Sequence, residues 1–460
     1  MSGIYEALAK IVGEKYVSNR MEEKYFYSRD QGLTEPCKPD YIVLPKTVDE
    51  VQAIVKLACK EKIPIVVRGA GLALTGLVRP LKGGIVLDLK RMDKILEVNE
   101  KSRYAIIEAG VTTGKLKAYL EHYHPSLRFS IPDAPPSATV AGNVVIHGQG
   151  RLTQQYGFNS DMVCGLEVVL PCGDVCRIGS CSISPYWFSK GPPLPDLSGL
   201  FLGWFGTTGI ITKIGIKLYP NKKIRDVEIF VTDDENLVPD IIARITYTEI
   251  VEDVNVWTQP YPLIYRGIHH ITAYVTGDSE EEIEFKKKMV IDSVRDYIKR
   301  KEGGFIFLTP DIKPVLLEMP QSSLTRFADV KRGGGFQYAG PIIPIEKYPE
   351  AYRRMVEVAE KYKTTWAIAS RVIGRGHCMM FGFSFPFSRI DPSDMERVKK
   401  ALHECDLIAL ELGGVPWKAE IPAQQEILKR MDQNTRKLIG QIKKLLDPYG
   451  IMNPGNWEVD

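Results

Sequence analysis

Three loops rich in glycine, serine and threonine constrain this chain of 460 residues more than any other feature. The first, RGAGLALTG at 68–76, follows the apolar run IPIVV at 63–67. It matches neither the GxxxxGK(S/T) phosphate loop nor the GxGxxG dinucleotide loop. Its glycines still allow several backbone N–H groups to turn toward an anion, although a plain connection between two strands would have the same pattern.

The second and third loops have the same chemistry. PDAPPSATVAGN at 132–143 leads into HGQG at 147–150, and GTTG at 206–209 precedes the apolar run IITKIGI at 210–216. Hydroxyl, amide and glycine residues dominate these loops, and there is almost no formal charge in them. Three such loops indicate a large, flat ligand whose diphosphate is bound by neutral donors.

Short strands and helices surround these loops. Thr47 and Glu50 form a capping-box pattern, and apolar residues at i, i+3, i+4 and i+7 follow them. The pattern changes after Lys222, where strands alternate with charged helices, so we place a domain boundary near that residue. We expect strands near 63–67, 83–89, 95–99, 104–110 and 164–170, a helix at about 114–122 and a final helix at about 423–446.

Charge and cysteine content exclude several classes of protein. The chain has 60 Lys and Arg against 57 Asp and Glu, a net charge of +3, which gives no support for nucleic-acid binding. Its longest uncharged stretches, 134–150 and 197–212, are too short and too polar for a membrane span, and we see no secretory signal at the N-terminus. The eight cysteines are scattered, which favours reduced thiols in a cytoplasm.

Taken in order, these segments resemble the FAD-binding domain of the vanillyl-alcohol oxidase and p-cresol methylhydroxylase superfamily. The branch of glycolate oxidase flavoprotein subunits and D-lactate dehydrogenases looks nearest. The match is specific over 38–220 and 440–456 and looser between them. Within it, 39–71 is similar to the opening helix, strand and diphosphate loop, 132–143 and 156–175 to the second flavin loop and next strand, 196–220 to the third loop, and 445–456 to the closing motif.

The resemblance implies an α+β fold with two domains. A two-part FAD-binding domain would span 1–222, completed by 440–460, and an α/β cap domain with an antiparallel sheet would span 223–439 and hold the substrate over the flavin ring. The implied FAD-binding residues are Arg68, Gly69, Ala70, Gly71, Leu72, Thr75, Gly76, Pro132, Ser137, Thr139, Gly142, Asn143, Gly150, Tyr156, Gly206, Thr207, Gly209, Ile210 and Asn453, with Pro454 and Gly455 closing the site.

Parts of the chain depart from the hydroxy-acid branch. The strand that would carry its histidine-rich metal signature reads GRGHCMMFGF at 374–383, and the region of its Glu-His-Gly signature reads GGVPWKAEIP at 413–422. We predict no metal ligands. The late region is as similar to the phenol-oxidising branch, but that branch places an acidic residue after Tyr-Gly, where this chain has Phe158.

Dehydrogenation on a flavin needs a base for the O–H proton of the substrate and a cation for a carboxylate or phenolate. Arg371, Arg375 and His377 lie at i, i+4 and i+6 of one apparent strand, so a period of two puts them on one face. That face would bind an anion and supply a base. Lys418 and Tyr338 are further candidates, and a solvated or packed side chain is the alternative for each.

The sequence therefore predicts an FAD-dependent dehydrogenase of a small 2-hydroxy acid, such as D-lactate or glycolate. Electrons would pass to a protein acceptor, plausibly an iron–sulfur protein, because the chain has no cluster motif of its own. Oxidation of a para-substituted phenol is one alternative, and an electron-relay subunit of a larger iron–sulfur complex is another. We expect a cytoplasmic protein that reaches a membrane only through a partner protein. The sequence does not determine whether the chain forms homo-oligomers.

Overall fold

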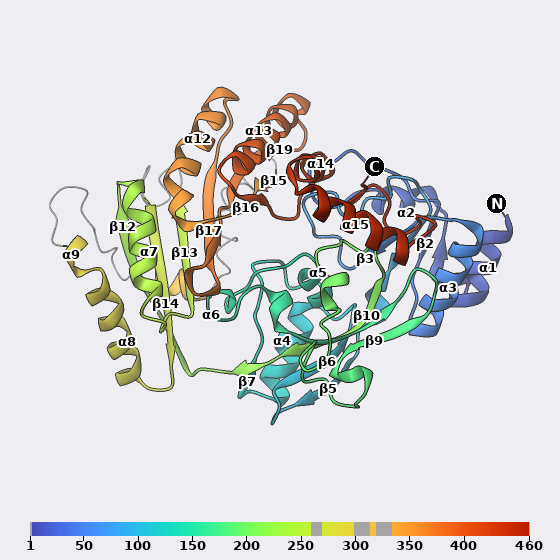
Figure 1. Cartoon of the computed structure of the whole chain (residues 1–460), viewed down its shortest axis with the longest axis horizontal. Coiled ribbons are helices and arrows are strands. Elements are labelled where there is room, and N and C mark those ends of the chain that lie inside the picture. Colours follow the sequence, from blue (N-terminus) through green and yellow to red (C-terminus); the bar gives the residue numbers. More distant parts are fainter. Residues whose placement is uncertain (1, 259–268, 299–312, 319–333, 460) are drawn as a thin grey trace.

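The computed structural model describes residues 2–258, 269–298, 313–318 and 334–459. Two small sheets lie at one end of the molecule, and a large antiparallel sheet with its helices lies at the other (Figure 1). The predicted α+β class and the antiparallel sheet in the later part of the chain are confirmed. Some stretches of the predicted cap region, 223–439, lie outside the described residues.

A four-stranded sheet in the order β1-β2-β4-β3 carries the first loop. Helix α3 (Val48–Glu61) joins β2 to β3 and buries the apolar face that the sequence predicts. The Thr47 hydroxyl caps it by accepting from the Glu50 N–H, whereas the Glu50 carboxylate accepts from the Lys46 N–H rather than from Thr47. The other elements are α1 (Ser2–Val12), α2 (Met21–Phe26), β1 (Val17–Ser18), β2 (Tyr41–Val43), β3 (Ile65–Arg68) and β4 (Ile85–Asp88).

A five-stranded antiparallel sheet in the order β5-β6-β10-β8-β9 follows, and it carries the third loop at the start of β10. Both small sheets share one apolar core, in which Ile54 of α3 packs with Ile107 and Ile214. The elements are β5 (Ile95–Asn99), β6 (Tyr104–Glu108), α4 (Thr113–Tyr123), β7 (Leu127–Arg128), α5 (Val140–Val145), α6 (Thr153–Tyr156), β8 (Val163–Val169), β9 (Val175–Gly179), β10 (Ile210–Lys217) and β11 (Tyr219–Pro220), which pairs with β7.

The large sheet runs in the order β12-β14-β13-β17-β18-β16-β20, and β19 pairs with both β17 and β15. Helices α7, α8, α12 and α13 cover one face, where they form a core with alternate residues of the strands, such as Val254 and Val256. Because side chains alternate along a strand, Asp253 and Asn255 point from the opposite face. That face meets the loops of the small sheets, since Arg371 on it forms an ion pair with Asp133.

The described elements of this later region are β12 (Ile224–Thr232), α7 (Val238–Thr246), β13 (Asp253–Thr258), β14 (His269–Gly277), α8 (Glu280–Ser293), α9 (Arg295–Ile298), α10 (Lys313–Glu318), β15 (Gly334–Ala339), β16 (Pro341–Ile343), α12 (Tyr348–Lys361), β17 (Ala367–Ile373), β18 (Cys378–Met380), β19 (Phe383–Ser388), α13 (Pro392–Glu411) and β20 (Val415–Pro416). In the described parts of the chain, no helix has the length and apolar character that a membrane span needs.

The predicted single helix at 423–446 is wrong. Two helices occupy this region, α14 (Ile421–Arg430) and α15 (Gln433–Leu446). The break occurs because the Asp432 side chain accepts from the Thr435 N–H and so starts a new helix. After α15 the chain returns to the first sheet, where the Ile65 N–H donates to the Ile451 carbonyl (2.7 Å) and the Asn453 N–H donates to the Ile65 carbonyl (2.8 Å).

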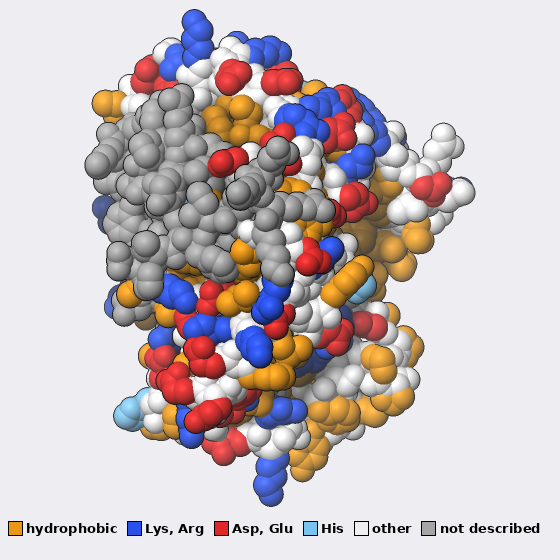
Figure 2. Space-filling view, turned by 90° about the vertical axis from the view of Figure 1, so that its left-hand side faces the viewer, with side chains coloured by type: hydrophobic (Ala, Val, Ile, Leu, Met, Phe, Trp, Pro, Cys, Tyr) orange, Lys and Arg blue, Asp and Glu red, His pale blue; other side chains and the backbone are white. Residues whose placement is uncertain are grey.

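The surface agrees with the near balance of charges in the sequence. On the face in Figure 2, basic and acidic side chains are interleaved over the large-sheet region and below it. Many of these charges pair within the same helix, as Lys286 does with Glu282 on α8 (2.5 Å). We read this face as a solvated surface.

Candidate functional site

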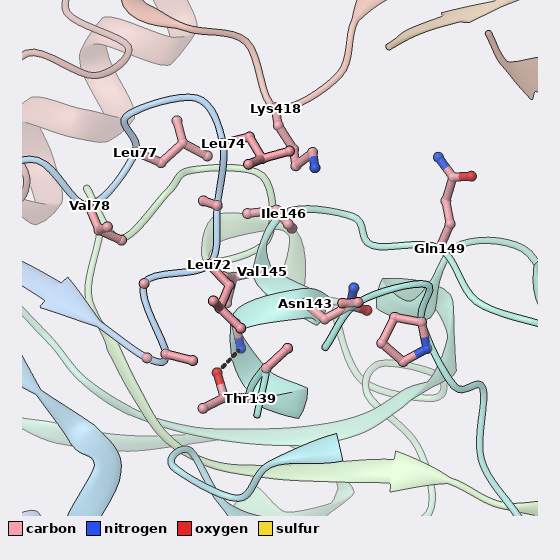
Figure 3. Close-up of a pocket in the computed structure, with 18 of the residues that line it drawn as sticks. Leu72, Leu74, Leu77, Val78, Thr139, Asn143, Val145, Ile146, Gln149 and Lys418 are labelled. Atoms are coloured by element: carbon pink, nitrogen blue, oxygen red, sulfur yellow. Dashed lines mark hydrogen bonds between the residues drawn. The ribbon is translucent and has the colours of Figure 1, made fainter. Parts of the chain in front are cut away.

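A cavity of about 480 Å³ lies where the loops of the two small sheets meet the open face of the large sheet. Its walls are mostly apolar, with Leu72, Leu74, Val145 and Ile146 among them (Figure 3). All three predicted loops reach this cavity. Packing of the two small sheets on one core therefore brings together loops that are far apart in the sequence.

The loop after β3 presents a row of free backbone donors. Among the described residues, no acceptor is found for the N–H groups of residues 69–75. Gly71 has a φ of +67°, and a Cβ at this position would lie 2.1 Å from Nη2 of Arg68. Successive free N–H groups in a glycine loop form a concave site for an anion. This donor set fits the diphosphate of FAD.

Two buried charged residues, Arg68 and Asp30, stabilise the first loop. The Arg68 guanidinium donates to the carbonyl of Arg29 and lies 5.1 Å from the centre of the Tyr27 ring. The Asp30 carboxylate accepts from the N–H groups of Gly32 and Gly76, at 2.9 and 2.8 Å. Burial raises the pKa of Asp30 to about 6. Sequence reasoning missed Asp30 because its partner in the loop is 46 residues away.

The second loop reaches the cavity through Thr139 and Asn143. The Thr139 hydroxyl accepts from the Gly142 N–H at 3.1 Å, which starts the short helix α5 (Figure 3). A Cβ at Gly69 would lie 2.5 Å from that hydroxyl, so the first and second loops approach each other closely. The Asn143 side chain accepts from Asn159 at 2.6 Å, which leaves its own amide N–H groups available to a ligand.

Asn453 ties the first loop to the third. Its Nδ2 donates to the carbonyls of Leu77 (3.0 Å) and Phe205 (2.6 Å). Lys443 adds a second tie, because its ammonium donates to the carbonyls of Thr207 (2.6 Å) and Met452 (3.1 Å). Burial lowers the pKa of Lys443. Lys443 pairs with Asp447, four residues later at the end of the same helix. This spacing is the one feature of the sequence that indicated a fixed position for Lys443.

The predicted FAD-binding residues divide into two groups, and their contact with FAD stays a prediction. Ser137 is exposed, and Tyr156 stacks on Tyr219 outside the cavity. The residues that line the cavity are Gly69, Ala70, Gly71, Leu72, Pro132, Thr139, Gly142, Asn143, Gly206, Gly209 and Ile210. Those that do not line it are Arg68, Thr75, Gly76, Ser137, Gly150, Tyr156, Thr207, Asn453, Pro454 and Gly455.

The expectation that Arg371, Arg375 and His377 share one strand face is wrong. Strand β17 ends at Ile373, and the chain turns through 374–376 before β18 begins. Glycines with positive φ at 374 and 376 permit this turn, so the period of two does not continue past it. Arg375 is exposed and pairs with Glu249, and His377 is also exposed. Neither lines the cavity.

Arg371 does line the cavity, but its nitrogen atoms are engaged. Nε and Nη2 donate to the Asp253 carboxylate at 3.0 and 2.9 Å, and Nη1 lies 2.6 Å from Oδ2 of Asp133. Burial by itself would lower the pKa of Arg371, but the two carboxylates raise it overall. Since Asp133 belongs to the second loop, this ion-pair network fixes that loop against the large sheet.

Tyr338 and Lys418 meet in the cavity. Nζ of Lys418 donates to the Tyr338 hydroxyl at 2.5 Å and lies 4.1 Å from the centre of the Trp417 ring. Trp417 in turn donates its Nε1–H to the Ile146 carbonyl at 2.7 Å, which fixes this segment over the second loop. In the described part of the chain no carboxylate pairs with Lys418. An ammonium has three N–H donors, so two remain for a ligand.

The residues present fit FAD. The first loop supplies free N–H groups for a diphosphate, and the apolar walls suit a flat ring system. This fit does not use two buried amides on the wall, Gln149 and Asn255, whose side-chain atoms have no partner in the described chain. No cluster of three or more metal-binding side chains occurs among the residues that the structure describes.

Comparisons with known proteins agree with this arrangement. Residues 39–179 match the model of the FAD binding domain, and residues 342–457 match the C-terminal domain of FAD linked oxidases. An uncharacterized FAD-linked oxidoreductase of Mycobacterium tuberculosis is 25% identical, with 99% of each chain covered. The glycolate oxidase subunit GlcD of Bacillus subtilis is also 25% identical, with 98% of this chain and 96% of that protein covered.

A solved structure shows the same fold. Substrate-bound p-cresol methylhydroxylase superposes with a TM-score of 0.85 at 22% identity, over 100% of this chain and 97% of that one. The first family model covers the first and second glycine loops, and the second covers cavity residues of the later region such as Arg371 and Lys418.

Proposed function

We propose, from the premise that this chain is an FAD-linked oxidoreductase, that it oxidises a small 2-hydroxy acid to the 2-oxo acid. D-Lactate and glycolate are the first candidates. Relatives include proteins named for these substrates, the glycolate oxidase subunit GlcD and the D-lactate dehydrogenase of Archaeoglobus fulgidus, which is 27% identical.

The observation that carries the proposal is the Lys418–Tyr338 pair. Lys418 brings a positive charge into a mostly apolar cavity and meets no carboxylate there in the described chain. A buried or half-buried cation is stable when it has a counter-ion, so this site favours an anionic ligand. The carboxylate of a 2-hydroxy acid has the charge and the size for it.

The chain's own residues account for binding and proton handling. Two free N–H donors of Lys418 bind the substrate carboxylate. Tyr338, fixed by Lys418, acts as a phenolate: it takes up the proton that leaves the substrate hydroxyl group and becomes the phenol. FAD, when bound, would supply the hydride acceptor. Loss of one hydride and one proton converts the 2-hydroxy acid to the 2-oxo acid, so the atoms and electrons balance.

Arg371 acts as a positioning residue in this proposal. Its network with Asp133 and Asp253 uses the guanidinium nitrogens, so it fixes the second loop instead of binding the substrate. His377 and Arg375 have no part, because both lie outside the cavity.

A second candidate is oxidation of a para-substituted phenol. Phe336, Tyr338 and Trp417 line the cavity, and such aromatic walls suit a phenol ring whose phenolate oxygen would meet Lys418. The 4-cresol dehydrogenase flavoprotein subunit of Pseudomonas putida is 24% identical. An electron-transfer protein would reoxidise the flavin in either case.

The proposal predicts that 2-hydroxy acids bleach the flavin. Purified FAD-loaded protein is mixed anaerobically with D-lactate, glycolate or 4-ethylphenol, and flavin absorbance is followed by stopped flow. We expect reduction by a 2-hydroxy acid but not by the phenol. Reduction by the phenol alone would replace the first candidate by the second. No reduction by either, with FAD bound, would favour a relay subunit.

Replacement of Tyr338 by phenylalanine tests the proton step. We expect the rate of flavin reduction to fall about 100-fold, because a positioned acid–base group contributes on that order. KM should change little, since Lys418 remains. Tyr247→Phe, at an 84% exposed position, is the matched control. A Tyr338→Phe variant that keeps both the rate and the pH profile of the parent would assign the proton to another group.

A further inference from the structure

Two amide side chains on the cavity wall have unused hydrogen-bonding atoms. Gln149 is 5% exposed, and neither Oε1 nor Nε2 has a partner among the described residues. Asn255 is 2% exposed, and its Nδ2 likewise has none there. Figure 3 shows Gln149 on the loop beside Asn143, with Lys418 on the facing segment. Both amides line the cavity that Lys418 enters.

Beside Asn255, the charge of Arg371 is compensated by two carboxylates. Asn255 pairs with Arg371 in the register of β13 and β17, so the two side chains leave the sheet on the same face. Arg371 is compensated by Asp253 and Asp133. Because these carboxylates already compensate the charge of Arg371, it attracts an anionic ligand group only weakly, and a neutral polar group suits this wall better.

A neutral group with both a donor and an acceptor matches the two amides. Gln149 offers one of each, and Asn255 offers N–H donors. Buried polar groups normally have partners, and two unpartnered amides in one cavity indicate that a ligand supplies those partners. A hydroxyl group can accept from Asn255 while it also bonds to Gln149.

We propose that Gln149 and Asn255 form a second subsite, which binds a hydroxyl group of the substrate. The preferred substrate would then be a 2-hydroxy acid with a further hydroxyl group beyond the oxidised carbon, and D-lactate or glycolate would leave this subsite unused. This inference rests on the proposed function, in which Lys418 binds the carboxylate of the substrate. The cavity therefore offers a cationic group and a neutral polar subsite.

Binding of acids that cannot be oxidised at C2 tests the subsite. FAD-loaded protein is titrated with 3-hydroxypropionate, 4-hydroxybutyrate and 5-hydroxypentanoate, and with propionate, butyrate and pentanoate, and the flavin absorbance reports the Kd. We expect at least one hydroxy acid to bind about 10-fold more tightly than its parent acid. In Asn255→Leu and in Gln149→Leu this preference should fall to within about twofold of unity.

Gln154→Leu is the matched control, because Gln154 is also a buried amide with an unpartnered Oε1 but lies outside this cavity. It should keep the preference of the parent. The proposal is overturned if no hydroxy acid binds more tightly than its parent acid, or if the preference survives both leucine variants. It is also overturned if either variant loses FAD or shifts the flavin absorbance before acid is added, because the amides would then bind the cofactor.

These titrations need no turnover. Failure of the proposed oxidation appears separately, as a flavin that no 2-hydroxy acid reduces, while the Kd values still report the subsite.

Discussion

We expect Lys418→Met to lower kcat/KM for the 2-hydroxy acid about 100-fold while FAD stays bound. Hydrogen bonds to a charged group contribute about 1.5–3 kcal/mol, and the upper part of that range corresponds to 100-fold. Methionine keeps the length of the side chain and removes its charge. KM should rise, because the carboxylate is bound in the ground state as in the transition state, and kcat should fall, because Lys418 also fixes Tyr338 for the proton step. Steady-state kinetics with an artificial electron acceptor measures it.

Lys400→Met on α13 is the matched control, because Lys400 forms an exposed ion pair with Glu396 at 3.6 Å and pairs of that kind contribute little. A Lys418→Met variant whose kcat/KM stays within about threefold of the parent would remove the carboxylate from this position. The same variant should leave the absorbance of the bound flavin in the absence of acid nearly unchanged.

Gly71→Ala should weaken FAD binding by about 10- to 100-fold. The position has a φ of +67°, which costs a residue with a Cβ about 1–2 kcal/mol. The added methyl group would also lie 2.1 Å from the Arg68 guanidinium, which cannot retreat easily because it is buried against Tyr27 and bonded to the Arg29 carbonyl. Relief of this clash displaces the free N–H groups of the first loop. Fluorescence titration of the FAD-free protein gives the Kd.

Gly199→Ala serves as the control for this substitution, since a Cβ there meets nothing within 4 Å. Equal FAD affinity in Gly71→Ala and Gly199→Ala would mean that the first loop does not bind the diphosphate. Thermal unfolding of both variants without FAD separates a local change in the loop from a general loss of stability.

Local patterns in the sequence located the three glycine loops and helix α3, and the resemblance to a known superfamily then predicted the cofactor. A Cβ at Gly69, Gly71 or Gly142 would lie within 2.6 Å of a side-chain atom of Thr139 or Arg68, and the need for glycine is visible in the sequence as glycine-rich loops. Thr47 likewise predicts the start of α3, because its side chain caps that helix. Such features depend on a few neighbouring residues, so no tertiary information is needed to find them.

The substrate half could not be predicted in the same way. His377 and Arg371 are six residues apart, but a tight turn sends them to different places, and nothing in a strand-like pattern of alternation shows the turn. Tyr338 and Lys418 are 80 residues apart and meet only because of sheet order and the course of the chain after β20. The sequence did not identify Asn255 as a cavity residue. A single Asn in an apolar strand is common, and only the tertiary structure shows that this one lines the cavity.

Asn453 has a consequence for the order of events during synthesis. It bonds to the carbonyls of Leu77 and Phe205, and Ile451 lies beside the first strand of the diphosphate loop. The ribosome therefore synthesises all three glycine loops long before Asn453, which joins two of them. We therefore expect FAD to bind only after residue 453 has been synthesised. A nascent chain stalled before that residue should lack the yellow colour of bound flavin.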